Sequence, residues 1–134
     1  MNILFFLTPK SEVAHIHTDD SLERALCKME KYRYTAVPII NQQGEYVGTI
    51  TEGDALWHIR HHECWNDNLD TVPVMQVGRR MDNKPVGIDV DIEDLVATSK
   101  MQNFIPVVDD NNIFIGIITR KDIIDYCFKK CKQK

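Results

Sequence analysis

Two short segments of the chain pair a hydroxyl with a carboxylate at one spacing. Thr51 is followed three residues later by Asp54, and Thr119 stands at the same spacing from Asp122. At the start of a helix this spacing is typical of a capping box, in which each side chain bonds the backbone N–H of the other residue. The free N–H groups of a helix start also attract anions. The hydroxyl could then hold a phosphate oxygen and the carboxylate a pair of ribose hydroxyls, so both interpretations stay open.

A proline and a glycine stand at fixed distances before each pair. Pro38 and Gly48 precede the first pair and Pro106 and Gly116 the second, with one displacement of 68 residues throughout (106 minus 38). The aligned runs are 37–40 with 105–108 and 46–54 with 114–122, without a gap between them. The chain therefore contains a duplication, and two copies indicate two similar halves rather than a solenoid. The proline predicts a strand start or a sheet edge, and the glycine predicts a bulge or a close backbone approach.

The residues around each pair predict the elements that position it. In the first half, Ser21 is a candidate N-cap for a helix with apolar residues at helical spacing. A strand over 36–40, a turn at 42–44, a return strand over 46–50 and a helix from Thr51 follow. The second half predicts a helix starting near Ile92, a strand over 104–108, a turn at 110–112, a strand over 113–118 and a last helix carrying Ile123. Residues 66–83 fit neither half and are interpreted as a connection, with 72–77 extended.

This repeated pattern resembles a tandem pair of cystathionine-β-synthase (CBS) domains, also called a Bateman module. The resemblance covers residues 9–128, with the first CBS motif at 9–65, a connecting segment at 66–83 and the second motif at 84–128. It implies an α+β fold in which two helix-strand-strand-helix motifs pack about a pseudo-twofold axis. It also implies a non-catalytic regulatory sensor that binds an adenine nucleotide between the motifs and signals to a partner protein.

In family members that bind such nucleotides, each cleft takes its proline segment from one repeat and its Thr-x-x-Asp from the other. The main chain before the proline faces the base, the acid takes the ribose hydroxyls, and the hydroxyl and basic residues take phosphate. The implied main cleft consists of Ala14, Tyr34, Thr35, Ala36, Val37, Pro38, Thr119, Arg120, Lys121 and Asp122. The implied second cleft consists of Thr51, Asp54, Asn103, Phe104, Ile105 and Pro106.

The two implied clefts differ in charge. Arg120 and Lys121 stand beside the phosphate position of the main cleft, where charge-assisted hydrogen bonds are strongest. Glu52 occupies the matching place in the second cleft, and the bulky Phe104 stands where the main cleft has a small residue. We expect one occupied nucleotide site, in the main cleft, and a weak or empty second cleft.

A narrower resemblance concerns the ligand. Residues 10–16 and 34–38 look like the small stand-alone CBS-pair proteins that bind cyclic di-AMP in many Gram-positive bacteria. Two positions depart from that group: Glu12 stands where its members tend to carry a lysine, and Asp122 is typical of mononucleotide binders. The sequence therefore does not separate AMP, ADP, ATP, cyclic di-AMP and S-adenosylmethionine. The expected ligand is one of the first four, the adenine nucleotides, with no other cofactor and no metal implied.

Three other functions compete with nucleotide sensing. His58 and His62 share one helical face near Cys64, but a fourth zinc ligand is not visible, so solvated histidines are favoured. The chain carries no nucleotide-phosphate glycine loop and no nucleophile elbow, which argues against an enzyme. A ligand-free dimerisation or interaction module is the main alternative, since CBS pairs generally form homodimers.

Composition sets the remaining expectations. The chain has 134 residues, 43% hydrophobic and 27% charged, with a net charge of −4. Such a surface does not draw nucleic acid or anionic lipid. The longest apolar run near the N-terminus, residues 3–7, is too short for a signal peptide or a membrane span. We therefore expect a cytoplasmic protein, with its four cysteines reduced.

Overall fold

A computed structural model describes residues 1–132, which form two compact units. The first unit comprises residues 14–82. The second comprises residues 1–13 together with the described chain from residue 83 onward. Each unit contains one copy of the repeat, and the first thirteen residues pack with the second copy, which the sequence pattern did not indicate.

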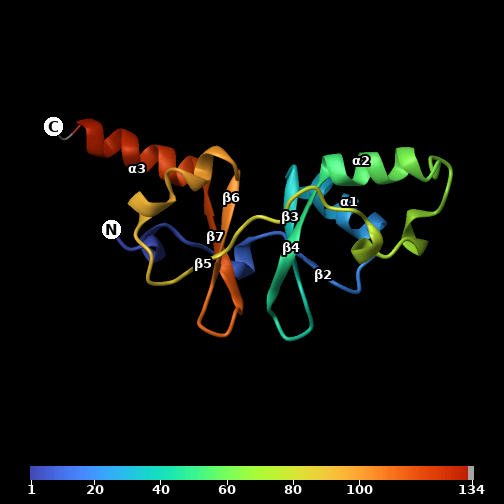
Figure 1. Cartoon of the computed structure of the whole chain (residues 1–134), viewed down its shortest axis with the longest axis horizontal. Coiled ribbons are helices and arrows are strands. Elements are labelled where there is room, and N and C mark those ends of the chain that lie inside the picture. The colour runs from blue at the N-terminus through green and yellow to red at the C-terminus, as the bar shows by residue number, and fades with distance from the viewer. Residues whose placement is uncertain (133–134) are drawn as a thin grey trace. The chain divides into compact units, whose positions relative to one another are not determined.

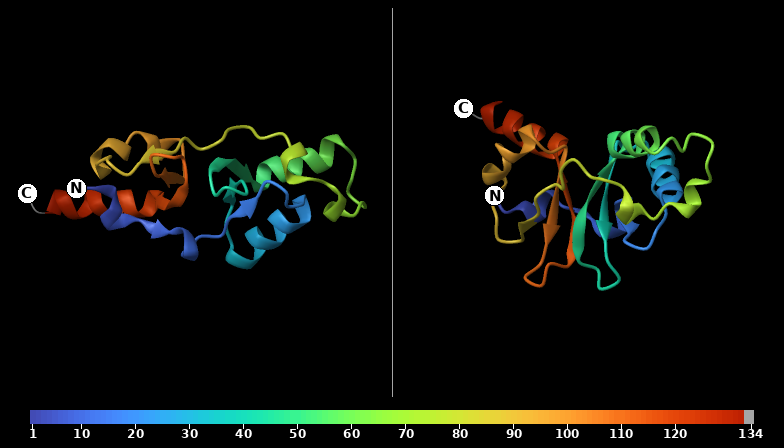
Figure 2. Two further views of the ribbon diagram at one scale, coloured as in Figure 1. Left: turned by 90° about the horizontal axis from the view of Figure 1, so that it is seen from below. Right: turned by 45° about the vertical axis from the view of Figure 1, so that its right-hand side comes forward.

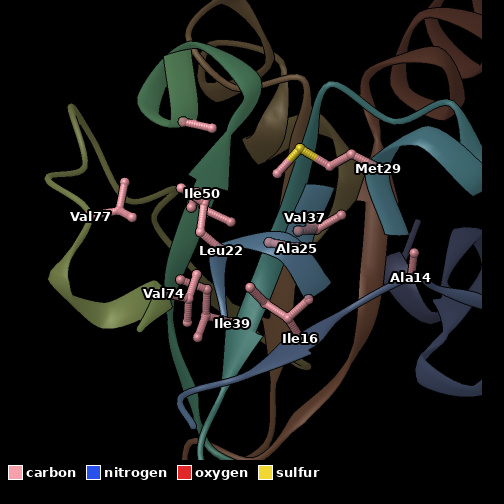
Figure 3. Close-up of a cluster of buried hydrophobic side chains, with 11 residues drawn as sticks. Ala14, Ile16, Leu22, Ala25, Met29, Val37, Ile39, Ile50, Val74 and Val77 are labelled. Carbon is pink, nitrogen blue, oxygen red and sulfur yellow. The ribbon is translucent and has the colours of Figure 1, made fainter. Parts of the chain in front are cut away.

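The first unit is a small sheet with two helices on one side (Figures 1 and 2). Strand β3 (Ala36–Ile40) pairs antiparallel with β4 (Tyr46–Thr51) and parallel with the short β2 (Ile16–His17). Helices α1 (Leu22–Tyr32) and α2 (Glu52–His61) pack on this sheet and on each other. Figure 3 shows the apolar cluster that the two layers enclose. Its members are Ala14, Ile16, Leu22, Ala25, Met29, Val37, Ile39, Ile50, Ala55, Val74 and Val77.

The second unit repeats this plan with an additional strand. Its sheet has the order β1 (Thr8–Pro9), β7 (Phe114–Thr119), β6 (Phe104–Val108) and β5 (Val86–Gly87). Helix α3 (Arg120–Lys132) follows β7 directly. The buried apolar cluster of this unit consists of Ile3, Ile92, Leu95, Ile105, Val107, Ile118 and Ile123. The predicted mixed helix-and-sheet fold in two similar halves is confirmed.

Both predicted hairpins are present, and their turns use the same chemistry. Asn41 accepts two backbone N–H groups through its Oδ1, from Gln43 and Glu45. In the second hairpin Asp109 Oδ1 accepts the N–H groups of Asn111 and Ile113. A short polar side chain that bonds its own turn in this way favours reversal of the chain.

The repeated prolines and glycines have structural roles in both units. Pro38 and Pro106 each lie one residue before the point where their strand begins to pair with its parallel neighbour, β2 or β5. Because proline has no backbone N–H to donate, this position loses no hydrogen bond to that neighbour. Gly48 and Gly116 lie beside a register shift in their hairpin. A Cβ at Gly48 would lie 2.4 Å from Asp82 Oδ1, and one at Gly116 would lie 2.2 Å from the Thr8 carbonyl oxygen. The predicted bulge and close approach both occur.

The first helix of the second copy differs from the prediction. The chain there forms two 3-10 turns, Ile92–Leu95 and Thr98–Lys100, and no α-helix. Asp91 makes no side-chain cap, and Ser99 Oγ donates to the Val96 carbonyl oxygen at 2.6 Å, which competes with regular helical bonding. The corresponding α1 begins with a Ser21 cap that accepts the N–H of Arg24, as predicted.

The segment between the copies also differs from the extended conformation predicted for residues 72–77. It contains 3-10 turns at Leu69–Thr71 and Val74–Gln76. This segment packs on the first unit through Val74 and Val77, whose side chains are buried in the cluster of Figure 3. Within residues 1–132, no helix combines the length and apolar character needed to cross a membrane.

Candidate functional site

The first proline segment, residues 34–38, begins where α1 ends. Arg33 closes the helix in the left-handed conformation (φ 59°), and the Tyr34 N–H donates to the Met29 carbonyl oxygen at 3.0 Å. The Tyr34 side chain is 40% exposed and stacks on Tyr32, with ring centroids 6.1 Å apart. A cavity of about 440 Å³ opens beside Tyr34 and Thr35. An exposed aromatic ring thus stands immediately before a buried strand.

Within each unit, a hydrogen bond joins the proline segment to the helix that follows the hairpin. The Glu52 N–H, at the start of α2, donates to the Thr35 carbonyl oxygen at 2.9 Å. The Arg120 N–H, at the start of α3, donates to the Asn103 carbonyl oxygen at the same distance. Each unit therefore holds a proline segment and a Thr-x-x-Asp helix start side by side.

The helix start of the first unit is a complete capping box. Thr51 Oγ1 accepts the Asp54 N–H, and Asp54 Oδ2 accepts the Thr51 N–H, both at 3.0 Å. The other oxygen, Asp54 Oδ1, accepts the N–H of Arg80 at 3.1 Å. Asp54 is only 6% exposed. Both of its oxygens are thus engaged in holding the chain together.

The helix start of the second unit is more open. Thr119 Oγ1 accepts the Asp122 N–H at 3.1 Å, and Asp122 Oδ2 accepts the Thr119 N–H at 3.2 Å. Within residues 1–132, that is the one hydrogen bond to the Asp122 carboxylate, and Asp122 lines a cavity of about 460 Å³ beside α3. The exposed Arg120 is anchored through its Nε, which donates to the Ser99 carbonyl oxygen at 2.7 Å. Lys121 is also exposed.

The second proline segment, residues 103–106, is more closed than the first. Two buried amides reach its main chain, because Asn83 Nδ2 donates to the Phe104 carbonyl oxygen at 3.0 Å and Gln102 Nε2 contacts it at 3.4 Å. Phe104 itself is 5% exposed and Ile105 is fully buried. The main chain that the family resemblance assigns to a base is thus bonded to protein side chains in this copy.

The predicted site residues are divided between the two units. The first unit holds Ala14, Tyr34, Thr35, Ala36, Val37, Pro38, Thr51 and Asp54. The second holds Asn103, Phe104, Ile105, Pro106, Thr119, Arg120, Lys121 and Asp122. Each predicted cleft therefore takes residues from both units, and its assembly stays a prediction.

A basic segment of the first unit, at Arg79 and Arg80, was not predicted from the sequence. Arg79 donates through Nε to Asp82 Oδ1 at 2.7 Å and through Nη2 to Asp82 Oδ2 at 3.3 Å. Asp82 Oδ1 also accepts the N–H of Thr49 at 2.9 Å, and these bonds hold the pKa of the Asp82 carboxyl below its usual value against the opposing effect of burial. Burial, the largest single effect, raises the pKa of the Asp82 carboxyl, but the bonds from Arg79 and Thr49 and the charge of Arg79 together outweigh it. The adjacent arginines at 79 and 80 were the available signal.

The histidines of α2 make no metal centre with their neighbours. The rings of His58 and His62 stack with centroids 4.2 Å apart, and the pKa of His58 is lowered by burial and by the neighbouring His62. The buried Cys64 thiol lies 3.8 Å from the Ile59 carbonyl oxygen. Among the described residues, no group of three or more His, Cys, Asp or Glu side chains could hold a metal ion.

Comparison with known proteins identifies the repeat. The family model described as "CBS domain" matches residues 6–61 and 74–129. An inosine-5'-monophosphate dehydrogenase of Helicobacter pylori is 28% identical over 109 residues, which are 81% of this chain and 21% of that enzyme. The chain thus spans about a fifth of the length of the curated enzymes it matches.

Two solved structures share the fold over nearly the whole chain. The Listeria monocytogenes CbpB protein in complex with c-di-AMP has a TM-score of 0.84 at 21% identity, covering 98% of both chains. CBSX2 in complex with AMP has a TM-score of 0.73 at 20% identity, covering 96% of both chains. From the two matched segments and this shared fold, the chain belongs to the CBS-domain family and carries two CBS domains in tandem.

Proposed function

We propose that this protein is a non-catalytic regulatory sensor for an adenine nucleotide. One observation carries the proposal: the start of α3 presents two exposed cations, Arg120 and Lys121, next to the incompletely bonded carboxylate of Asp122. Cations beside a helix start favour phosphate, and a carboxylate with a free oxygen can accept ribose hydroxyls. The solved CBS pairs bound to c-di-AMP and to AMP support the same ligand class.

The ligand takes contacts from both repeats in this proposal. Tyr34 and Thr35 of the first proline segment contact the base, since an exposed aromatic ring offers a stacking surface. Ala14, Ala36, Val37 and Pro38 form the apolar wall behind it. Thr119, Arg120 and Lys121 hold phosphate. A ligand that bonds both repeats favours one arrangement of the two by its differential affinity, which a partner protein can read.

In this proposal, the residues of the second predicted cleft bind nucleotide weakly or not at all. Asp54 has both oxygens bonded within the protein, and the Phe104 carbonyl oxygen already accepts side-chain amides. A ligand would have to break these bonds, and leaving a buried polar group unpaired costs about 1–3 kcal/mol each. One ligand per chain is therefore expected.

AMP, ADP, ATP and cyclic di-AMP remain the candidate ligands. Dependence on Asp122 favours a ligand with free ribose hydroxyls, and dependence on Arg120 and Lys121 alone favours the cyclic dinucleotide. A cytoplasmic homodimer that signals to a partner protein completes the proposal.

A second candidate is a ligand-free dimerisation or interaction module. Exposed apolar side chains favour it: Leu56 and Trp57 on α2 are 47% and 51% exposed, and Ile124 and Phe128 on α3 are 56% and 60% exposed. Exposed apolar side chains on either helix suit contact with a second copy of the chain or another protein. Ligand binding distinguishes the two candidates, because a sensor can also be a dimer.

A thermal-shift experiment separates them. A nucleotide at about a hundred times its dissociation constant adds about 2.7 kcal/mol to the free energy of unfolding, a shift of several degrees. The sensor proposal expects a shift with one of the four candidates. Arg120→Ala should remove this shift, and Arg24→Ala, which changes an arginine on α1 outside the proposed site, should leave it intact. If none of the four shifts the wild type, the interaction module is the better account.

A further inference from the structure

A groove beside α2 is lined by none of the residues of the proposed main nucleotide site. It has a volume of about 420 Å³ and lies entirely within the first unit. One wall is formed by successive turns of α2, including Trp57 and His61, and the other by the segment from Gly78 to Arg80. Aromatic and cationic groups therefore face one another across a small hollow.

Two arginines line this groove, and they are held differently. The Arg79 side chain is 18% exposed and is fixed by its two hydrogen bonds to the Asp82 carboxylate. Arg80 is fixed through its backbone, whose N–H donates to Asp54 Oδ1 at 3.1 Å. No hydrogen bond or ion pair within residues 1–132 engages the exposed Arg80 guanidinium, so its charge is available to a ligand.

One carboxylate, that of Asp54, also lines the groove. Both oxygens of Asp54 accept backbone N–H groups, from Thr51 and from Arg80, and the residue is buried. These bonds orient the carboxylate towards the backbone but leave its negative charge in place. The Arg80 guanidinium, which is unpaired among the described residues, offsets this charge, because Arg79 is already paired with Asp82.

Three histidines, His58, His61 and His62, extend the donor surface. The Nδ1 atom of His62 lies 3.0 Å from the His58 carbonyl oxygen. Because a carbonyl only accepts, Nδ1 of His62 is the donor in this hydrogen bond. The pKa of His58 is lowered by burial and by His62, so a bound anion would favour its charged form.

We propose that this groove binds a doubly charged oxyanion, the phosphate group of a small molecule. Arg80 supplies the mobile cation, Arg79 the fixed one, and the histidines supply additional donors when protonated. Trp57, which is 51% exposed and stacks on His61 at 6.2 Å, forms the apolar edge. None of these residues belongs to the proposed main nucleotide site, so the two proposals stand or fall separately.

Tryptophan NMR tests this proposal, because the chain has two tryptophans and only Trp57 lines the groove. Inorganic phosphate is titrated into the labelled full chain at constant ionic strength, with the indole signals assigned through Trp65→Phe. We expect a saturable shift of the Trp57 indole signal and none at Trp65, which is 61% exposed. In Arg80→Ala the dissociation constant should rise about tenfold, equivalent to losing one charge-assisted bond of about 1.4 kcal/mol.

Arg24→Ala is the matched control, because it removes an exposed arginine of the same unit that does not line the groove. Equal affinity in Arg80→Ala and Arg24→Ala, or a linear and unsaturable shift at Trp57, would overturn the proposal. Sulfate then tests the histidines, because its charge is constant over the pH range in which histidine titrates. Sulfate should bind more tightly at pH 6 than at pH 8, and unchanged affinity would refute the role given to His58.

Discussion

The same Thr-x-x-Asp motif should respond differently to mutation in the two repeats. Asp54→Ala removes acceptors from two backbone N–H groups, those of Thr51 and Arg80, in a residue that is 6% exposed. Asp122→Ala removes the acceptor of one, that of Thr119. In both variants the threonine hydroxyl keeps its bond to the backbone N–H at the mutated position.

The magnitudes follow from these bonds. Losing the carboxylate half of a capping box costs about 1 kcal/mol, which is the expected loss for Asp122→Ala. Asp54→Ala loses in addition a charge-assisted bond worth about 1.5–3 kcal/mol. The free energy of unfolding should therefore fall by about 3 kcal/mol in Asp54→Ala and by about 1 kcal/mol in Asp122→Ala.

Urea denaturation measures both values by far-ultraviolet circular dichroism. Both tryptophans lie in the first unit, so fluorescence reports that unit separately and should follow the loss in Asp54→Ala. Asp125→Ala, an exposed acid on α3, controls for the removal of a negative charge. Equal losses in Asp54→Ala and Asp122→Ala would refute the assignment of a structural role to one motif and an open carboxylate to the other.

Two further predictions concern the second unit. Gly116→Ala would place a Cβ 2.2 Å from the Thr8 carbonyl oxygen. It should lower the free energy of unfolding by about 1–3 kcal/mol, which a thermal melt detects as a fall in Tm of about 3–10 °C. Gly87→Ala is the control and should leave Tm unchanged, because nothing lies within 4 Å of a Cβ at that position. Hydrogen bonds, chiefly from the Tyr126 hydroxyl, lower the pKa of Glu93 from its ordinary 4.5 to about 2, so the stability it contributes is present above pH 4.5 and is lost as the pH falls towards 2. Glu93→Gln should flatten that part of the pH–stability profile, and an unchanged acid limb would contradict the assignment.

The hairpins and the helices that follow them could be predicted from the sequence because their signals are local. Strand periodicity, a turn-forming Asn41 or Asp109 and a Thr-x-x-Asp cap all lie within a few residues of the structure they determine. The duplication added a second, independent copy of each signal. Strands β3 and β6 consequently have the predicted bounds.

The misses have two physical causes. The pairing of Thr8 and Pro9 with β7 joins residues more than a hundred positions apart, and nothing local in a two-residue strand indicates its partner. The apolar spacing after Ile92 fits an α-helix and a pair of 3-10 turns equally well, and the side-chain bond of Ser99 favours the latter. The sequence likewise does not indicate that Arg79 bonds Asp82, or that the Asp82 carboxylate lies against Gly48, because these contacts depend on how the segment folds back onto β4.

The most direct test of nucleotide sensing is calorimetric titration of AMP, ADP, ATP and cyclic di-AMP into the full chain. The account predicts saturable binding of one of these ligands with one site per chain. Arg120→Ala should weaken it by at least about tenfold, as the loss of a charge-assisted phosphate contact requires, and Asp54→Asn should leave it unchanged. Two equivalent sites per chain, or binding that Arg120→Ala leaves intact, would contradict the account.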